Sequence, residues 1–251
     1  MKSQENMNHL VIPDSHGEYD KVCRIIDAYQ DTVDRFVFLG DVVDGAEAKP
    51  LISLVRSLGE KAITVVGNHE WVLRNALQEE PDELVEYWRD RLWSRYERDM
   101  LINYGVQRSR NWECNAEALR EEMLANGHLD WLNSLPAFYE TPSFVVVHAG
   151  PQHDTPWHVQ RKELEESSST EQRMESEPAQ LFSHDLAGVE DLPSEVDDRI
   201  FITGHSHLST GLDSRRAAGR ICLGSKTRAG EPMFTWESAS DEIKAHKPGK
   251  R

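Results

Sequence analysis

Short apolar runs alternate with polar, glycine-containing loops along the first part of the chain. Three such runs occupy residues 10–12, 36–39 and 63–66, and a polar loop follows each one directly. Short apolar runs bounded by turn residues are typical of buried strands. Between the runs, apolar residues recur every three or four positions over 22–29 and 51–58, which predicts amphipathic helices. This order of strands and helices predicts an α/β fold in which helices cover a sheet.

The middle of the chain shows a helical pattern without strand signals. A densely charged stretch over 82–104 carries an apolar stripe, and a second helix is expected over 117–125. Residues 77–135 are therefore predicted to form a helical insertion. Four further strands are expected beyond it, at residues 144–147, 200–203, 220–223 and 233–236.

Two segments contain few apolar residues. Residues 160–178, rich in Ser, Glu and Arg, fit either a mobile loop or a solvated helix, and the composition favours the mobile loop. The tail over 238–251 is predicted to be disordered. A single domain is therefore expected over residues 9–237.

The net charge narrows the range of partners. Lys and Arg number 28 against 44 Asp and Glu, which gives a net charge of −16. This charge repels a phosphodiester backbone, so we expect no binding to a nucleic-acid duplex. No apolar run approaches the roughly 20 residues that span a bilayer, so we expect no membrane association.

The cysteines and the start of the chain indicate the compartment. Cys23, Cys114 and Cys222 are widely spaced and odd in number, so they predict neither a disulfide framework nor a metal knuckle. The first apolar run is too short for a secretion signal. These features predict a cytoplasmic protein.

Five loops that directly follow predicted strands carry residues that bind metal ions. They are Asp14-x-His16, Gly40-Asp41-x-x-Asp44, Gly67-Asn68-His69-Glu70, His148-Ala149-Gly150 and Gly204-His205-Ser206-His207. In open α/β sheets the carboxyl ends of the strands line one crevice, so loops far apart in sequence converge there. Carboxylate, imidazole and amide oxygen donors together suit Mn²⁺, Fe or Zn²⁺.

Each loop by itself has a simpler explanation. Turn or helix-cap chemistry accounts for loops such as those of Asp14, Asp41 and Asn68. His148 and His205 fit histidines with satisfied hydrogen bonds near a sheet edge. These explanations do not account for five such loops in this order, all at strand ends, so the joint occurrence favours a metal site.

The ordered set of loops resembles the calcineurin-like metallophosphoesterases over residues 10–236. The motifs that carry the resemblance are Asp14-Ser15-His16-Gly17, Gly40-Asp41-Val42-Val43-Asp44-Gly45, Gly67-Asn68-His69-Glu70, His148-Ala149-Gly150 and Gly204-His205-Ser206-His207. Two further stretches are similar to the phosphoprotein-phosphatase branch, which also contains the bacterial diadenosine tetraphosphatases: Asn103-Tyr104-Gly105-Val106 and Leu132-Asn133-Ser134-Leu135-Pro136. The resemblance implies a β-sandwich flanked by helices, in four α-β-β-α layers.

The resemblance also implies two divalent metal ions, with Mn²⁺ expected and Fe or Zn²⁺ as alternatives. The ligands of the first ion would be Asp14, His16 and Asp41, with His207 as a candidate fourth. The ligands of the second ion would be Asp41, Asn68, His148 and His205, which makes Asp41 the bridge. Two such ions lower the pKa of a shared water and clamp the phosphoryl oxygens.

For catalysis, the resemblance implies that metal-activated water attacks phosphorus and that no covalent enzyme intermediate forms. His69 would protonate the leaving oxygen as the general acid. Asp44 would orient His69, since a neighbouring carboxylate favours the imidazolium.

Two departures from the branch concern the substrate. The branch usually has Arg at the position of Gly45, where it binds phosphate, and its tryptophan-and-arginine stretch is not recognisable near residues 181–184. Arg74, Lys226 and Arg228 are candidate replacements as phosphate ligands. Exposed surface charges are the simpler interpretation of each.

The expected function is hydrolysis of phosphomonoesters, resembling that of the Ser/Thr protein phosphatases. The substrate would be a phosphorylated small molecule, a nucleotide or a phosphoprotein. Diadenosine tetraphosphate, or a related nucleotide, is the alternative substrate. A non-catalytic binding module on the same fold would usually lack a metal ligand or the pair of His69 and Asp44, and all of these residues are present.

Overall fold

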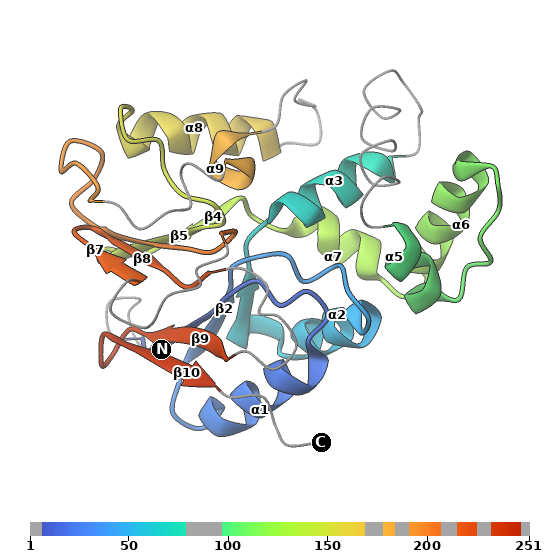
Figure 1. The fold of residues 1–251 in the computed structure, drawn as a ribbon, viewed down its shortest axis with the longest axis horizontal. Coiled ribbons are helices and arrows are strands. Elements are labelled where there is room, and N and C mark those ends of the chain that lie inside the picture. The colour runs from blue at the N-terminus through green and yellow to red at the C-terminus, as the bar shows by residue number, and fades with distance from the viewer. Residues whose placement is uncertain are drawn as a thin grey trace.

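Two five-stranded sheets form the centre of the protein, and helices lie on their outer sides (Figure 1). The computed structural model describes residues 7–78, 97–168, 178–183, 191–206, 215–224 and 232–246. Within these ranges, no helix is long and apolar enough to cross a membrane.

The first sheet contains the three strands expected at the start of the chain. In spatial order its strands are β10 (Glu242–His246), β9 (Met233–Glu237), β1 (His9–Ile12), β2 (Arg35–Phe38) and β3 (Ala62–Thr64). β1, β2 and β3 run parallel, whereas β9 runs antiparallel to β1 and to β10. Because the three parallel strands end at the same edge, the loops that follow them open on one side of the sheet.

The second sheet repeats this arrangement with the later part of the chain. In spatial order its strands are β4 (Phe138–Glu140), β5 (Phe144–Val147), β6 (Ile200–Thr203), β8 (Arg220–Cys222) and β7 (Arg216–Ala217). β5, β6 and β8 are parallel, so the loops after β5 and β6 also open at one edge. The short strands β4 and β7 were not predicted from the sequence.

The α-helices of the described residues are α1 (Tyr19–Tyr29), α2 (Ala48–Ser57), α3 (Asn68–Ala76), α5 (Glu97–Tyr104), α6 (Trp112–Ala125), α7 (His128–Ser134), α8 (Trp157–Ser168) and α9 (Ala179–Phe182). α1 and α2 lie on one outer side, α8 and α9 lie on the other, and α5, α6 and α7 lie at one end of the sandwich (Figure 1). α3 lies beside α7. Of the helix predicted over 82–104, the structure describes residues 97–104, and residues 79–96 lie outside the described ranges.

Three apolar clusters produce the layers. One cluster fills the space between the sheets and includes Val11, Val37, Leu39, Val146, Ile202 and Trp236. A second joins the first sheet to helices such as α1 and α2, and a third joins the second sheet to α8. The predicted four-layer α-β-β-α sandwich is therefore confirmed.

Part of the tail predicted to be disordered forms strand β10. The strand pairs with β9 over residues 242–246, and its side chains reinforce the pairing. Lys244 Nζ lies 2.6 Å from Glu237 Oε2, and the Thr235 hydroxyl lies 2.8 Å from His246 Nε2. The disorder prediction was wrong here because polar cross-strand pairs and the backbone ladder substitute for apolar burial. Residues 247–251 lie outside the described ranges.

Helix α8 occupies the first part of the segment for which a mobile loop was favoured. Trp157 and Leu164 are each 1% exposed, and they pack against Val145, Val147 and Phe201 of the second sheet. Two anchors seven residues apart lie on the same face of a helix, so they fix the segment although its other faces are polar. The mobile-loop prediction was wrong for residues 160–168, and residues 169–177 lie outside the described ranges.

Candidate metal centre

The loops after five parallel strands bring the predicted metal ligands together. Those after β1, β2 and β3 come from the first sheet, and those after β5 and β6 come from the second sheet. Three groups have donor atoms that all lie within 4.8 Å of one another: Asp14 with His16 and Asp41, Asp41 with His148 and His205, and His16 with Asp44 and His69. The donor cluster, defined here as Asp14, His16, Asp41, Asn68, His148 and His205, therefore lies across the edges of both sheets.

Asp41 lies between the two halves of the donor cluster. The first half contains Asp14 and His16, and the second half contains Asn68, His148 and His205. Its Oδ2 atom is 3.6 Å from His16 Nε2 and 3.5 Å from His148 Nε2. Its backbone adopts a φ of 49°, which is uncommon for a residue other than glycine. The same Oδ2 atom lies 3.5 Å from His69 Nε2, so three imidazoles surround it. This position suits a carboxylate that serves two cations.

The hydrogen-bond partners of His148 and His205 indicate which ring nitrogen of each carries a proton. His148 Nδ1 lies 2.7 Å from the Leu39 carbonyl, and His205 Nε2 lies 3.1 Å from the Phe182 carbonyl. Since a carbonyl can only accept, each of these two nitrogens carries a proton. Burial lowers the pKa of His148 and so favours its neutral form, although the negative charge of Asp41 opposes this shift.

The remaining nitrogens of these histidines face each other. His148 Nε2 lies 3.1 Å from His205 Nδ1 and 2.9 Å from Asn68 Oδ1. Asp41 Oδ2 lies 3.5 Å from the same nitrogen. With neutral imidazoles these four atoms would all offer lone pairs, a donor set that fits a divalent ion.

The surroundings of Asp14 favour a bound cation in the first half of the donor cluster as well. Its Oδ2 accepts the backbone N–H of His205 at 2.8 Å, but its buried Oδ1 has no hydrogen-bond partner among the described residues. Burial raises the pKa of Asp14, and the negative charge of Asp41 raises it further. A bound cation would offset both the desolvation and the repulsion between the carboxylates.

Two glycines make room for these carboxylates. A Cβ atom at Gly67 would overlap Asp41 Oδ1, and a Cβ atom at Gly204 would overlap Asp14 Oδ1. Both glycines belong to the loops identified in the sequence. The close approach of backbone to carboxylate explains why glycine stands at these two positions.

Glu70 holds the Asp41 loop, a role that the sequence did not reveal. Its side chain is fully buried, and its two oxygens accept the backbone N–H groups of Gly67, Asp41, Val42 and Val43 at distances of 2.6–3.1 Å. Burial raises the pKa of Glu70 to about 7, and the charge of Asp41 adds to this shift. An acidic residue in the first turn of α3 was a visible capping signal, but its contacts with residues 41–43 depend on the tertiary fold.

Asp44 connects two histidines beside the donor cluster. Its carboxylate oxygens lie 2.7 Å from His16 Nδ1 and 3.0 Å from His69 Nδ1. Burial by itself would lower the pKa of His69, but the charges of Asp41 and Asp44 outweigh it and raise the pKa. Burial opposes protonation of His16 too, yet the charge of Asp44 raises its pKa to about 9. The structure thus brings His69 and Asp44 together as the sequence predicted.

The sequence matches the family model of calcineurin-like phosphoesterases over residues 7–222. The chain belongs to this family. The match includes all five loops that carry the candidate metal ligands.

Relatives with known names extend the comparison. The symmetrical bis(5'-nucleosyl)-tetraphosphatase of Dechloromonas aromatica is 25% identical over 147 residues, which cover 57% of this chain and 44% of that protein. The chain spans about half the length of the curated relatives that it matches. Sequence similarity to these relatives is therefore partial.

Solved structures show the same fold at lower identity. A serine/threonine phosphatase from Saccharomyces cerevisiae superposes with a TM-score of 0.59 at 13% identity, covering 98% of this chain and 81% of that one. A metallophosphoesterase from Sphaerobacter thermophilus gives a TM-score of 0.51 at 17% identity, covering 98% and 89%. At this identity the likeness concerns the fold.

The backbone of this phosphoesterase leaves no room for a side chain at Gly45. Its φ is 91°, and a Cβ atom there would overlap the His16 carbonyl. The loop of Gly45 therefore packs backbone against backbone on the loop of His16. This contact is a physical reason for the absence of the arginine that the related branch usually carries.

Of the three candidate phosphate ligands, the structure describes Arg74. Arg74 is 7% exposed, so its interpretation as an exposed surface charge was wrong. Its guanidinium lies 4.8 Å from the centre of the Trp71 ring, and burial lowers its pKa to about 10. Lys226, Arg228 and the candidate metal ligand His207 lie outside the described residues.

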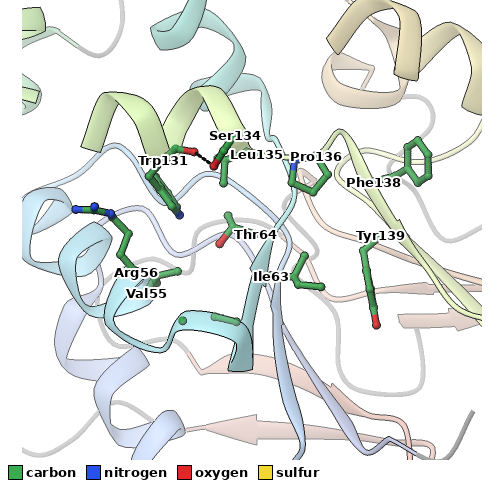
Figure 2. A pocket seen from close by; sticks show the side chains of 12 residues that line it. Val55, Arg56, Ile63, Thr64, Trp131, Ser134, Leu135, Pro136, Phe138 and Tyr139 are labelled. Atoms are coloured by element: carbon green, nitrogen blue, oxygen red, sulfur yellow. Dashed lines mark hydrogen bonds between the residues drawn. The ribbon is translucent and has the colours of Figure 1, made fainter. Parts of the chain in front are cut away.

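An apolar groove of about 450 Å³ contains none of the metal donors. It lies at the edge strand β3, where Ile63 and Thr64 face Trp131, Leu135 and Tyr139 (Figure 2). Arg56 is the charged side chain among its lining residues. The candidate metal site is thus recognised by the convergence of its donor atoms, and this groove is a separate feature.

Proposed function

We propose that this chain is a metal-dependent phosphoesterase that hydrolyses phosphoric esters with water. The observation that supports it best is the set of lone-pair donors around Asp41 Oδ2, which faces His16 on one side and His148 on the other. The proposed ligands of one ion are Asp14, His16 and Asp41, and those of the other are Asp41, Asn68, His148 and His205. When bound, two such ions lower the pKa of water and offset the charge of the phosphoryl oxygens.

His69 is the proposed general acid. Its Nδ1 lies 3.0 Å from Asp44 and its Nε2 lies 3.5 Å from Asp41 Oδ2. Nε2 is the proposed donor of the proton to the leaving oxygen. Burial lowers the pKa of His69, but the charges of Asp41 and Asp44 outweigh burial and raise it, which favours the protonated ring. Asp44 also contacts His16, so one carboxylate fixes a proposed metal ligand and the proposed acid together.

Water is the proposed nucleophile, and the hydroxyl that lies between two proposed ligands in the sequence is committed elsewhere. Ser15, between Asp14 and His16, is fully buried, and its hydroxyl donates to the Pro13 carbonyl at 3.1 Å. A side chain held in this way does not attack a substrate. The proposal therefore contains no covalent enzyme intermediate.

Two substrate classes remain candidates. The name of the curated relatives, symmetrical bis(5'-nucleosyl)-tetraphosphatase, favours a dinucleoside tetraphosphate. The resemblance to the Ser/Thr phosphatases favours a phosphomonoester. In either case we propose Mn²⁺ as the bound metal and the cytoplasm as the location, with Arg74, Lys226 and Arg228 as candidate phosphate ligands.

A panel of metals and substrates tests the proposal. The metal-free protein is loaded with Mn²⁺, Fe²⁺ or Zn²⁺ and assayed on an aryl phosphomonoester, an aryl phosphodiester, a phosphopeptide and diadenosine tetraphosphate, with Asp41→Asn as the inactive control. Release of two nucleoside diphosphates per tetraphosphate would support the nucleotide candidate. Metal binding without hydrolysis of any substrate would contradict the proposed function and favour a non-catalytic binding module.

A further inference from the structure

An asparagine of the helical insertion contacts the loop that follows Asp44. Asn103, on α5, donates from Nδ2 to the Gly45 carbonyl at 2.9 Å, and its Oδ1 accepts the backbone N–H of Lys49 at 3.3 Å. One side chain therefore holds both the residue after Asp44 and the start of helix α2. Asn103 begins the stretch Asn103-Tyr104-Gly105-Val106, which resembles the phosphoprotein-phosphatase branch but has no assigned role in the sequence.

The contact with Lys49 supplies a missing helix cap. The N-cap residue of α2 is Glu47, and its side chain makes no capping hydrogen bond. Lys49 is the second residue of the helix, whose N–H has no partner inside the helix. Asn103 thus caps α2 from another helix, as an asparagine at the N-cap position would do.

The contact with Gly45 lies one residue from Asp44, which forms the proposed catalytic pair with His69. Gly45 follows Asp44, whose carboxylate lies 2.7 Å from His16 Nδ1 and 3.0 Å from His69 Nδ1. On its other side Gly45 packs directly on the His16 carbonyl. A shift of the Gly45 carbonyl would therefore move Asp44 relative to both imidazoles.

The helix that carries Asn103 is itself well anchored. Met100, Leu101 and Tyr104 of α5 are buried, and the Tyr104 hydroxyl lies 2.6 Å from His128 Nδ1 on α7. The Lys49 ammonium lies 4.9 Å from the centre of the Tyr104 ring. These contacts of α5 hold Asn103 in place beside the Gly45 loop.

We propose that Asn103 is a positioning residue that sets the place of Asp44 and, through it, the orientation of His69. This inference rests on the proposed function, since it assigns Asn103 to the protonation of the leaving group. Asn103 would touch neither the substrate nor a metal ion. Its loss would therefore slow proton transfer and leave metal binding intact.

The test compares Asn103→Ala and Asn103→Asp with a matched control, Asn126→Ala. Both asparagines donate from Nδ2 to the carbonyl four residues earlier, Asp99 or Glu122, each at 2.7 Å. Asn126 lies in the same insertion, at the end of α6, so the two alanine variants differ in the Gly45 and Lys49 contacts. Asn103→Asp keeps the shape but replaces the donor with an oxygen that repels the Gly45 carbonyl.

Steady-state kinetics on two esters provide the first readout. In both Asn103 variants we expect kcat on an alkyl phosphate to fall about tenfold, since small misplacements of catalytic groups have effects of this order or larger. The aryl phosphate, which leaves with little help from a proton, should lose less than about threefold. KM, metal content and the Asn126→Ala control should be unchanged. An equal loss on both esters would overturn the positioning role.

Amide hydrogen exchange provides a readout that needs no activity. Asn103→Ala should accelerate exchange at the start of α2, where Lys49 loses its acceptor, and Asn126→Ala should not. Unchanged exchange there would overturn the capping contact. If wild-type protein hydrolyses no ester, the proposed function and the catalytic part of this inference both fail, whereas the exchange result still decides whether Asn103 holds the loop.

Discussion

Glu70 accepts the backbone N–H of Asp41 at 2.7 Å, so a fully buried carboxylate on α3 fixes the residue proposed to bridge two metal ions. The same side chain also binds the next two N–H groups of that loop. The backbone of the Asp41 loop is thereby held in place without a metal ion.

Glu70→Gln should destabilise the protein and weaken metal binding. The amide replaces one acceptor oxygen by an NH₂ group that faces backbone N–H groups, and a buried donor left without an acceptor costs about 1–3 kcal/mol. Urea unfolding of the metal-free protein and metal titration measure the two effects. Glu60→Gln, at an exposed glutamate, is the control. Equal stability and metal affinity in Glu70→Gln and wild type would contradict this role.

His69→Asn should keep both metal ions and lose turnover. If His69 protonates the leaving oxygen, the loss should reach about 10²–10⁴ on an alkyl phosphate, the usual range for general acid–base catalysis. An aryl phosphate should suffer less, and Asp44→Asn should show the same trend more mildly. Kinetics and metal analysis on the same preparations check this. Loss of metal from His69→Asn would mean that this residue is a ligand.

The metal-free protein should become less stable as the pH rises from about 6.5 to 9. His16 has an ordinary pKa of 6.5 and a folded pKa of about 9, because the charge of Asp44 outweighs burial. Its ion pair therefore stabilises the fold fully below pH 6.5, and this contribution, up to about 3 kcal/mol, is lost as the pH passes through 9. Urea unfolding at several pH values measures the slope. Asp44→Asn should flatten it, and an unchanged slope in that variant would refute the assignment.

Gly45→Ala should destabilise the protein more than Gly59→Ala. Both glycines have a positive φ, of 91° and 55°, but a Cβ at Gly59 meets open space whereas one at Gly45 overlaps the His16 carbonyl. Strained backbone of this kind costs about 1–3 kcal/mol before the overlap is counted. Thermal unfolding compares the two variants. For the same reason Gly45→Arg should not create a phosphate site, and higher turnover in that variant would show that the loop can rearrange.

The candidate site was largely predictable because its residues follow apolar strands. Asp14, Asp41, Asn68, His148 and His205 each lie within two residues of a predicted or observed strand end or in the loop that follows it, and parallel strands bring such loops to one edge. Their roles as ligands remain predictions. Their proximity follows from strand order, which the alternation of apolar and polar segments already indicates.

The contacts that Glu70 and Asn103 make with distant segments could not be predicted. Glu70 binds N–H groups 27–29 residues away, and Asn103 binds groups 54 and 58 residues away. Neither contact leaves a periodic pattern in the sequence. Strand β10 was missed for a related reason, because its polar side chains pair with β9 and bury little apolar surface.

The donor cluster draws residues from both sheets, and this determines when an ion can enter during folding. Asp14, Asp41 and Asn68 follow strands of the first sheet, whereas His148 and His205 follow strands of the second. The proposed ligands of one ion, Asp41, Asn68, His148 and His205, come from both sheets, so this set is complete only after the sheets have docked. The proposed ligands of the other ion, Asp14, His16 and Asp41, all follow strands of the first sheet. An ion bound by the shared set would therefore favour the docked state over every partly assembled one.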